Sequence, residues 1–150
     1  MKSLKLLMVA TCLAAVSLSV QARETEREKA NIRTVEALYS AALNDKDFAK
    51  ARTYIGDRYI PHNPTARNGI DGLKAFIDFL RAKFPESHSD IKQAFADGNY
   101  VILHVHSVRV PGTLGRAIVD IFRLENGKVV EHWDVVQDIP EHAANSNTMF

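Results

Sequence analysis

The feature that most constrains the fold is a hairpin signal at Asn126-Gly127, between two alternating apolar runs that together span 117–137. Asn and Gly both tolerate the positive φ angles of a two-residue type I′ turn, so this dipeptide predicts two paired antiparallel strands. Because side chains alternate along a strand, one face of the first strand carries a single charged residue, Asp120, among Ile118, Phe122 and Leu124. An unpaired buried carboxylate is too costly, so Asp120 must be paired, protonated or exposed in a cavity.

The turn also sets which residue lies opposite Asp120. A regular two-residue loop places Trp133 opposite Asp120 and Val135 on the same surface, and we expect this register. A bulged loop would shift the pairing by one residue and bring His132 and Asp134 to that surface instead. A shift of the strand pairing by one residue therefore changes which side chain lies next to Asp120.

The N-terminal half of the sequence predicts three helices. Apolar residues at three- and four-residue spacing predict a first helix over 24–43, and Asp47 caps a second, shorter one. A third helix begins near Asp71 and stops before Pro85. Between the second and third helices, the segment YIPHNP at 59–64 predicts a structured loop, because its prolines forbid a regular helix.

The C-terminal half changes to an apolar period of two. This period predicts strands over 91–96 and 100–110, followed by the two strands of the hairpin. A chain of 150 residues suits one domain. Helices followed by a meander of antiparallel strands predict an α+β fold, with three N-terminal helices packed on one face of a curved sheet.

Residues 1–22 have the pattern of a secretory signal peptide. Lys2 and Lys5 precede an apolar run, 6–20, which is short for a membrane span of about 20 residues. Small residues flank the expected cleavage site after Ala22. We therefore expect a cleaved signal peptide at 1–22, a mature domain at 23–150, export to the periplasm, and no membrane partner after cleavage.

Cleavage removes several functional classes from consideration. It takes away Cys12, the only cysteine, so thiolate nucleophiles and thiolate metal sites are excluded. Losing Lys2 and Lys5 leaves 17 of the 19 basic residues against 18 acidic ones. This balance, without a basic stripe, predicts no nucleic-acid partner.

Two histidines offer candidate chemistry beside Asp120. His104 and His106 share one face of the strand at 100–110. If that face is concave, both imidazoles lie near Asp120, and such a cluster suits proton transfer. The alternative is a pair of half-exposed strand histidines whose ring nitrogens form ordinary hydrogen bonds and take no part in chemistry.

Other polar and aromatic residues are further candidates. His62 lies in the proline-bounded segment and either closes a cavity mouth or caps the loop backbone. A zinc site of His62, His104, His106 and Asp120 is conceivable, but the sequence has no helical His-x-x-x-His, so we predict no metal. Trp133 is either core or a substrate wall. Tyr39 and Tyr54 are expected on helices with hydroxyls at a polar spot.

The strings YIPHNP, LHVHSVRV and AIVDIFRLENGKVVEHWDVVQ, in this order after the helices, resemble the SnoaL-like polyketide cyclase family of the nuclear transport factor 2-like superfamily. The resemblance covers nearly all of 30–150. It implies a cone-shaped α+β barrel with a deep apolar pocket, and a homodimer formed through the open face of the sheet. It also implies that Asp120 is the general acid/base of an aldol closure without cofactor or metal. Ketosteroid isomerase and dehydratases share the fold and the use of a carboxyl in an apolar cone.

These observations lead to one expected activity and one alternative. The first is a cofactor-independent aldol cyclisation, isomerisation or dehydration of a small hydrophobic carbonyl compound. Asp120 would remove a proton next to the carbonyl, His104 or His106 would assist, and His62 would close the mouth. Apolar walls and substrate contacts would come from Trp133, Phe122, Ile118, Val135, Tyr39 and Tyr54. The alternative is a non-catalytic exported module that binds a small molecule.

Overall fold

The computed structural model describes residues 25–150, so the expected signal peptide lies outside the described residues. The elements follow the chain as α1 (Glu26–Tyr39), a π-helical turn (Ser40–Asn44), α2 (Phe48–Arg52), β1 (Ile55–Pro61), α3 (Gly69–Lys83), β2 (His88–Asp97), β3 (Tyr100–Val108), β4 (Arg116–Glu125) and β5 (Lys128–Asp138). The strands form one sheet in the order β1-β5-β4-β3-β2, in which only β1 pairs in parallel. The predicted α+β class, with a mainly antiparallel sheet, is confirmed. No helix within 25–150 is long and apolar enough to cross a membrane.

Local capping explains where the helices begin. Thr25 and Glu28 form a capping box at the start of α1, in which each side chain accepts from the other residue's backbone N–H. Asp47 caps α2, as predicted, by accepting from the Lys50 amide at 3.0 Å. The expected first helix ends in the π-helical turn, which follows directly after Tyr39.

The segment YIPHNP is not a free-standing loop. Its first residues, Tyr59 to Pro61, belong to β1, which pairs with β5 through Ile60–Glu131 and Pro61–His132. The loop prediction was therefore wrong for this half of the segment. Proline lacks an N–H donor and is tolerated on an edge strand, and β1 is an edge strand here.

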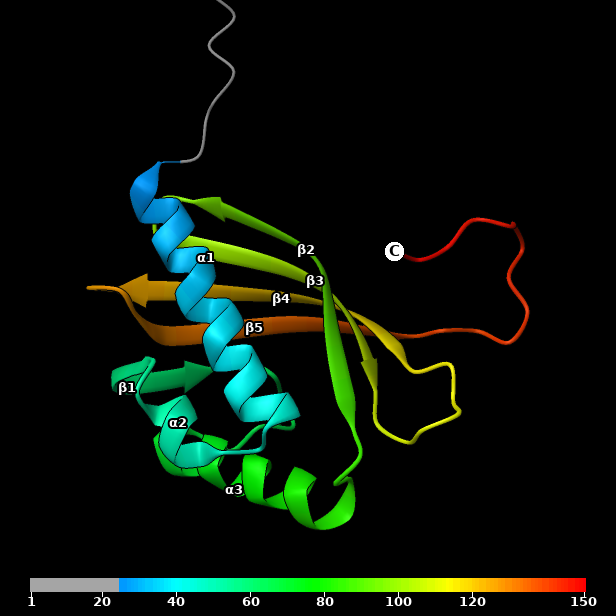
Figure 1. The fold of residues 1–150 in the computed structure, drawn as a ribbon, viewed down its shortest axis with the longest axis horizontal. Helices are drawn as coiled ribbons and strands as arrows, with labels where there is room; N and C mark the ends of the chain where they lie inside the picture. Colours follow the sequence, from blue (N-terminus) through cyan, green and yellow to red (C-terminus); the bar gives the residue numbers. More distant parts are fainter. Residues whose placement is uncertain (1–24) are drawn as a thin grey trace, which may run out of the picture.

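The helices cover one face of the sheet, which we call the inner face. Figure 1 shows α1 lying across the curved sheet, with α2 and α3 beside β1. The inner residues of β3 are Val101, Leu103 and Val105, which are all fully buried. Together with Val35, Leu38 and Ile77 from the helices they form the core. Burying this apolar surface is what holds the helices on the sheet.

The opposite side of the sheet, the outer face, retains exposed apolar side chains. Its residues are Phe95 on β2, Tyr100 and Ile102 on β3, Val119 on β4 and Val135 on β5, each at least partly open to solvent. His104 and His106 alternate with the buried residues of β3 and therefore share this face. The C-terminal Phe150 ring packs there, 4.8 Å from the His106 ring and 5.3 Å from the His104 ring.

The hairpin contains the most consequential difference from the predicted structure. Asn126 and Gly127 adopt φ angles of 50° and 71°, and Glu125 pairs with Lys128 as a two-residue turn requires. Two residues further on, β5 contains one extra residue, Val130, between the pairs Leu124–Val129 and Arg123–Glu131. Such a bulge exchanges the faces of all later residues in the strand.

As a result, the expected pairing of Asp120 with Trp133 was wrong. Asp120 pairs with Asp134, and Trp133 pairs with Ile121 on the outer face. This is the arrangement of the alternative register, although the extra residue lies within the strand and not in the loop.

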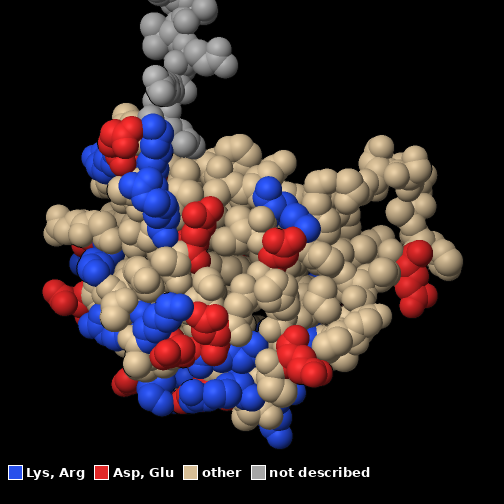
Figure 2. Space-filling view, viewed as in Figure 1, with Lys and Arg blue, Asp and Glu red and all other residues tan. Residues whose placement is uncertain are grey.

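Charged side chains form no single-sign patch on the face seen in Figure 2. Lys, Arg, Asp and Glu are interspersed over the helical side of the molecule in that view. Several of them are paired at short range, for example Lys74 with Asp78 and Lys50 with Asp45. Such exposed pairs contribute little stability, so the core carries most of it.

Candidate active site

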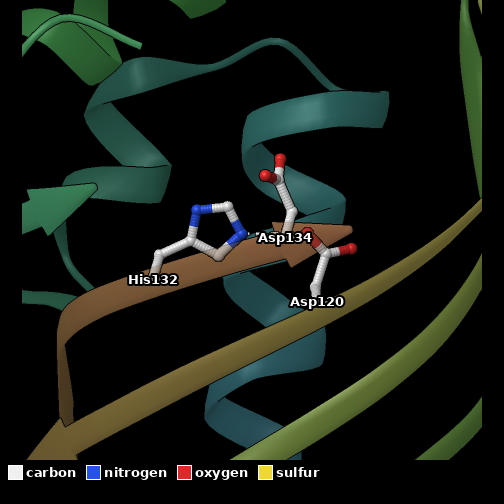
Figure 3. Close-up of side chains that lie close together, drawn as sticks. All are labelled: Asp120, His132 and Asp134. Atoms are coloured by element: carbon white, nitrogen blue, oxygen red, sulfur yellow. Dashed lines mark hydrogen bonds and ion pairs between the residues drawn. The ribbon is translucent and has the colours of Figure 1, made fainter. Parts of the chain in front are cut away.

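A buried carboxylate lies at the centre of the inner face. Asp120 on β4 is only 4% exposed. Its Oδ1 lies 2.9 Å from His132 Nε2, and its Oδ2 accepts a hydrogen bond of 2.9 Å from the Tyr39 hydroxyl. Figure 3 shows the His132 ring on β5 turned toward Asp120 on the neighbouring strand, with Asp134 beside them. Both oxygens of the buried carboxylate therefore have partners, as burial of a charge requires.

A second carboxylate lies directly across the strands. Asp134 pairs with Asp120 in the β4–β5 ladder, and both of its oxygens lie 2.8 Å from the Asn63 side-chain nitrogen. Asn63 is itself fixed, because its Oδ1 accepts from the Thr65 amide and hydroxyl. The segment after β1 thus positions a neutral donor on Asp134.

Aromatic rings hold the imidazole of His132 in place. The Phe122 ring stacks against His132 with centroids 4.6 Å apart, and Tyr59 lies parallel to it at 6.5 Å. Tyr39 meets Phe122 edge to face at 6.3 Å. Packing of this kind restricts the rotamers of a functional side chain.

These groups open onto a cavity of about 290 Å³ between the sheet and the helices. The volume is at the lower end of the range for small-molecule sites, about 300–1,000 Å³. Apolar walls come from Leu38, Ala42, Leu73, Phe76, Leu80, Ile118 and Phe122. The polar lining beside Asp120 comprises Tyr39, Tyr59, Asn63, His132 and Asp134.

Burial and the nearby carboxylate keep both tyrosines protonated. Burial raises the pKa of Tyr39 well above its usual value, and the negative charge of Asp120 raises it further. The pKa of Tyr59 is raised by the same two causes. Tyr39 donates to Asp120, whereas the Tyr59 hydroxyl takes part in no hydrogen bond within 25–150. Tyr59 is therefore a free neutral donor on the cavity wall.

Three potential metal ligands are also close together. One ligand atom from each of Asp120, His132 and Asp134 lies within 4.8 Å of the others. Carboxylate and imidazole donors suit several divalent cations. However, hydrogen bonds already engage both oxygens of each carboxylate, so the present geometry is accounted for as a hydrogen-bonded network.

The structure brings together only some of the residues predicted for the site. Asp120, Phe122, Ile118 and Tyr39 line the cavity. Tyr54 does not, because it lies beyond the end of α2 and packs against the core.

Several predicted contacts with the cavity were wrong. His104 and His106 lie on the outer face, and His106 Nε2 contacts the Leu114 carbonyl oxygen at 2.8 Å. Trp133 and Val135 also lie there, because the bulge exchanges the faces of β5. His62 does not line the cavity either, since its ring stacks on Trp133 at 4.5 Å. Its Nε2 lies 2.9 Å from Glu131, and this contact, with that of Arg123, lowers the pKa of Glu131.

The residues that the sequence analysis missed are Tyr59, Asn63, His132 and Asp134. His132 and Asp134 belonged to the alternative register and were set aside with it. The signal available in the sequence was Val129-Val130, two consecutive apolar residues that interrupt the alternation of apolar and polar residues along β5. Both valines are buried, and the bulge lies at the second of them. Tyr59 was missed because its segment was predicted to be a loop and not a strand, and Asn63, which does lie in the loop after β1, was not weighed as a site residue.

The comparisons with known proteins agree with this fold. The family model for the SnoaL-like polyketide cyclases matches residues 33–143. No curated protein is significantly similar to the chain. Among solved structures, an NTF2-like protein of unknown function from Burkholderia xenovorans is 22% identical, with a TM-score of 0.64 over 80% of this chain and 92% of its own.

Two further structures have the same fold. A candidate SnoaL-like polyketide cyclase from Jannaschia is 20% identical, with a TM-score of 0.60 over 76% of this chain and 90% of its own. AclR, a candidate hydroxylase from Streptomyces galilaeus, is 18% identical, with a TM-score of 0.62 over 75% of this chain and 82% of its own. At such identities the likeness concerns the fold alone, because one fold supports many activities.

Proposed function

Because the chain belongs to the SnoaL-like polyketide cyclase family, we propose that it is a cofactor-independent acid/base enzyme acting on a small hydrophobic carbonyl compound. One observation carries the proposal. The Asp120 carboxylate is buried at the wall of an apolar cavity and is held by His132 and Tyr39. A positioned carboxylate in a largely apolar site is suited to removing a proton from carbon.

In the proposed reaction, Asp120 accepts the proton from the carbon next to the substrate carbonyl. The electrons of the broken C–H bond form an enolate, whose oxygen accepts a hydrogen bond from the Tyr59 hydroxyl. His132 and Tyr39 keep the carboxylate oriented. Asp120 then returns the proton, either to a different carbon, which isomerises the substrate, or to the alkoxide formed when the enolate attacks a second carbonyl in the same molecule.

Proton exchange with solvent tests this proposal against the alternative of a non-catalytic binding module. The probe is 1-indanone, a small apolar ketone, incubated with the protein in D₂O and followed by proton NMR. We expect loss of the signal of the protons next to the carbonyl at a rate above that in buffer. Binding detected by line broadening, without exchange above the buffer rate, would support the binding module and contradict catalysis.

The expected homodimer remains a prediction, and we propose the outer face as its interface. Its exposed apolar residues include Val135, which is 70% exposed, and Phe95, which is 53% exposed. Contiguous exposed apolar surface of this kind marks interaction sites. Val135→Glu should therefore lower the mass measured by sedimentation velocity from dimer to monomer, whereas Val110→Glu, beyond the end of β3, should not. A wild-type monomer, or an unchanged Val135→Glu dimer, would contradict the proposal.

A further inference from the structure

The cavity has a cationic end that acid/base chemistry at Asp120 does not use. Arg109, just beyond β3, and Arg116, the first residue of β4, both line the cavity together with Ser87. We infer that these three residues bind a carboxylate, so that the substrate is a keto acid with an apolar chain. The inference rests on the proposed function for the carbonyl end of the substrate, and on the geometry below for its acidic end.

The sheet register brings the three residues together. Ser107 pairs with Arg116, and His88 pairs with Val108. Continuing the second ladder by one residue places Ser87 opposite Arg109. Arg109 also shares the inner face with Ser107, because the two are two positions apart along the strand. Partial burial lowers the pKa of Arg109, and the positive charge of nearby Arg116 lowers it further.

Arg109 is a half-buried cation without an anionic partner. Within 25–150 it forms no ion pair and no side-chain hydrogen bond, and its guanidinium lies 5.5 Å from the centre of the Phe84 ring. Stacking on an aromatic ring holds a guanidinium in place while leaving its edge N–H groups available. Planar guanidinium groups match the geometry of a carboxylate.

Ser87 supplies an independent indication of a ligand. Its hydroxyl oxygen is the only buried side-chain polar atom without a hydrogen-bond partner among the described residues. Ser87 is also one of the residues that line the cavity, as are Arg109 and Arg116. Native proteins leave few buried polar groups unpaired, and such a group calls for an explanation. A carboxylate oxygen at the arginines would accept the missing hydrogen bond.

Nearby acidic groups compete only weakly. Asp138 lies 3.2 Å from Arg116 Nε, but its side chain is 83% exposed. Glu141 lines the adjoining surface pocket with Arg109 and Arg116 and is also exposed. Exposed ion pairs of this kind are worth little, so a carboxylate inside the cavity can take their place.

The strand also limits the length of the ligand. Arg116 and Asp120 lie four residues apart on the same face of β4, so their Cα atoms are about 13 Å apart. A ligand that contacts both groups therefore has to fit within roughly this distance. A keto acid such as 6-oxoheptanoate satisfies the limit and fits an apolar chain between its two polar ends.

The test compares 6-oxoheptanoate with its methyl ester, which has the same ketone but no charge. Binding is measured by calorimetry, and exchange of the protons beside the ketone is measured by NMR in D₂O. We expect the wild type to bind the acid at least about tenfold more tightly than the ester. Arg109→Gln should remove most of this preference, Arg109→Lys should retain part of it, and the exposed Arg33→Gln should retain all of it.

The outcomes separate this inference from the proposed function. Equal affinity for acid and ester, absence of binding to both, or an unchanged preference in Arg109→Gln would overturn the inference, even if the ketone protons exchange. Preferential binding of the acid that depends on Arg109, without exchange, would support the carboxylate site and contradict the proposed catalysis.

Discussion

Asp120→Asn is expected to lower the rate of ketone proton exchange by at least about 100-fold, the lower bound for removing a general base. The amide has nearly the shape of the carboxylate and can still accept a hydrogen bond from Tyr39. It cannot take up the substrate proton at neutral pH, because its oxygen is far less basic. The measurement is the rate of proton exchange on the ketone that the wild-type protein exchanges fastest, at a saturating and at a low concentration of that ketone.

The matched control is Asp57→Asn, an exposed carboxylate on β1 that takes part in no ion pair within 25–150. It should exchange the probe at the wild-type rate. Circular dichroism and the melting temperature show whether the Asp120 variant is folded. A folded Asp120→Asn protein with undiminished exchange would exclude this carboxylate from the mechanism.

Leu103→Ala is expected to lower the free energy of unfolding by about 2–5 kcal/mol. Leu103 is fully buried on the inner face and pairs with Asp120 across the β3–β4 ladder. Truncation removes apolar contacts and leaves a void that the packed sheet and helices cannot fill completely. Urea unfolding followed by circular dichroism, at one fixed protein concentration, measures the change.

The neighbouring residue on the same strand provides the control for Leu103→Ala. Ile102 points to the outer face and is 37% exposed. Ile102→Ala removes a branched apolar side chain from the same strand but should cost less than half as much. Equal losses at both positions would contradict the assignment of inner and outer faces, on which the placement of Asp120 also depends.

Much of the fold follows from local patterns in the sequence. The helices have apolar stripes and recognisable caps, and the antiparallel strands have a clear period of two, so their positions were predicted correctly within a few residues. β1 was missed because Pro61 and Pro64 are typical of loops. Its partner strand β5 lies more than 70 residues further along the chain, and no local pattern predicts this pairing. An edge strand tolerates a proline, whereas an inner strand does not.

The site was harder to predict than the fold, because it depends on which face of the sheet each strand residue points to. Asp120 was identified from its own strand alone, and it does line the cavity. Its neighbours come from other strands, and each assignment required knowing which face those strands present. The histidines of β3 were assigned to the wrong face, and the partners on β5 were assigned to the wrong register. Contacts across strands depend on bulges that short sequence patterns do not reveal.

The extra residue in β5 requires space for its side chain beside β1. The Val130 side chain packs over Gly56 of β1, where an added Cβ would lie only 2.8 Å from Val130 Cγ1. The missing side chain at Gly56 therefore leaves room for the residue that turns His132 and Asp134 inward. Neither Gly56 nor Val130 lines the cavity. Which polar groups reach the cavity thus depends on the space between Gly56 and Val130, two residues outside it. We therefore expect substitutions at these two positions to alter the chemistry of the site without contacting a ligand.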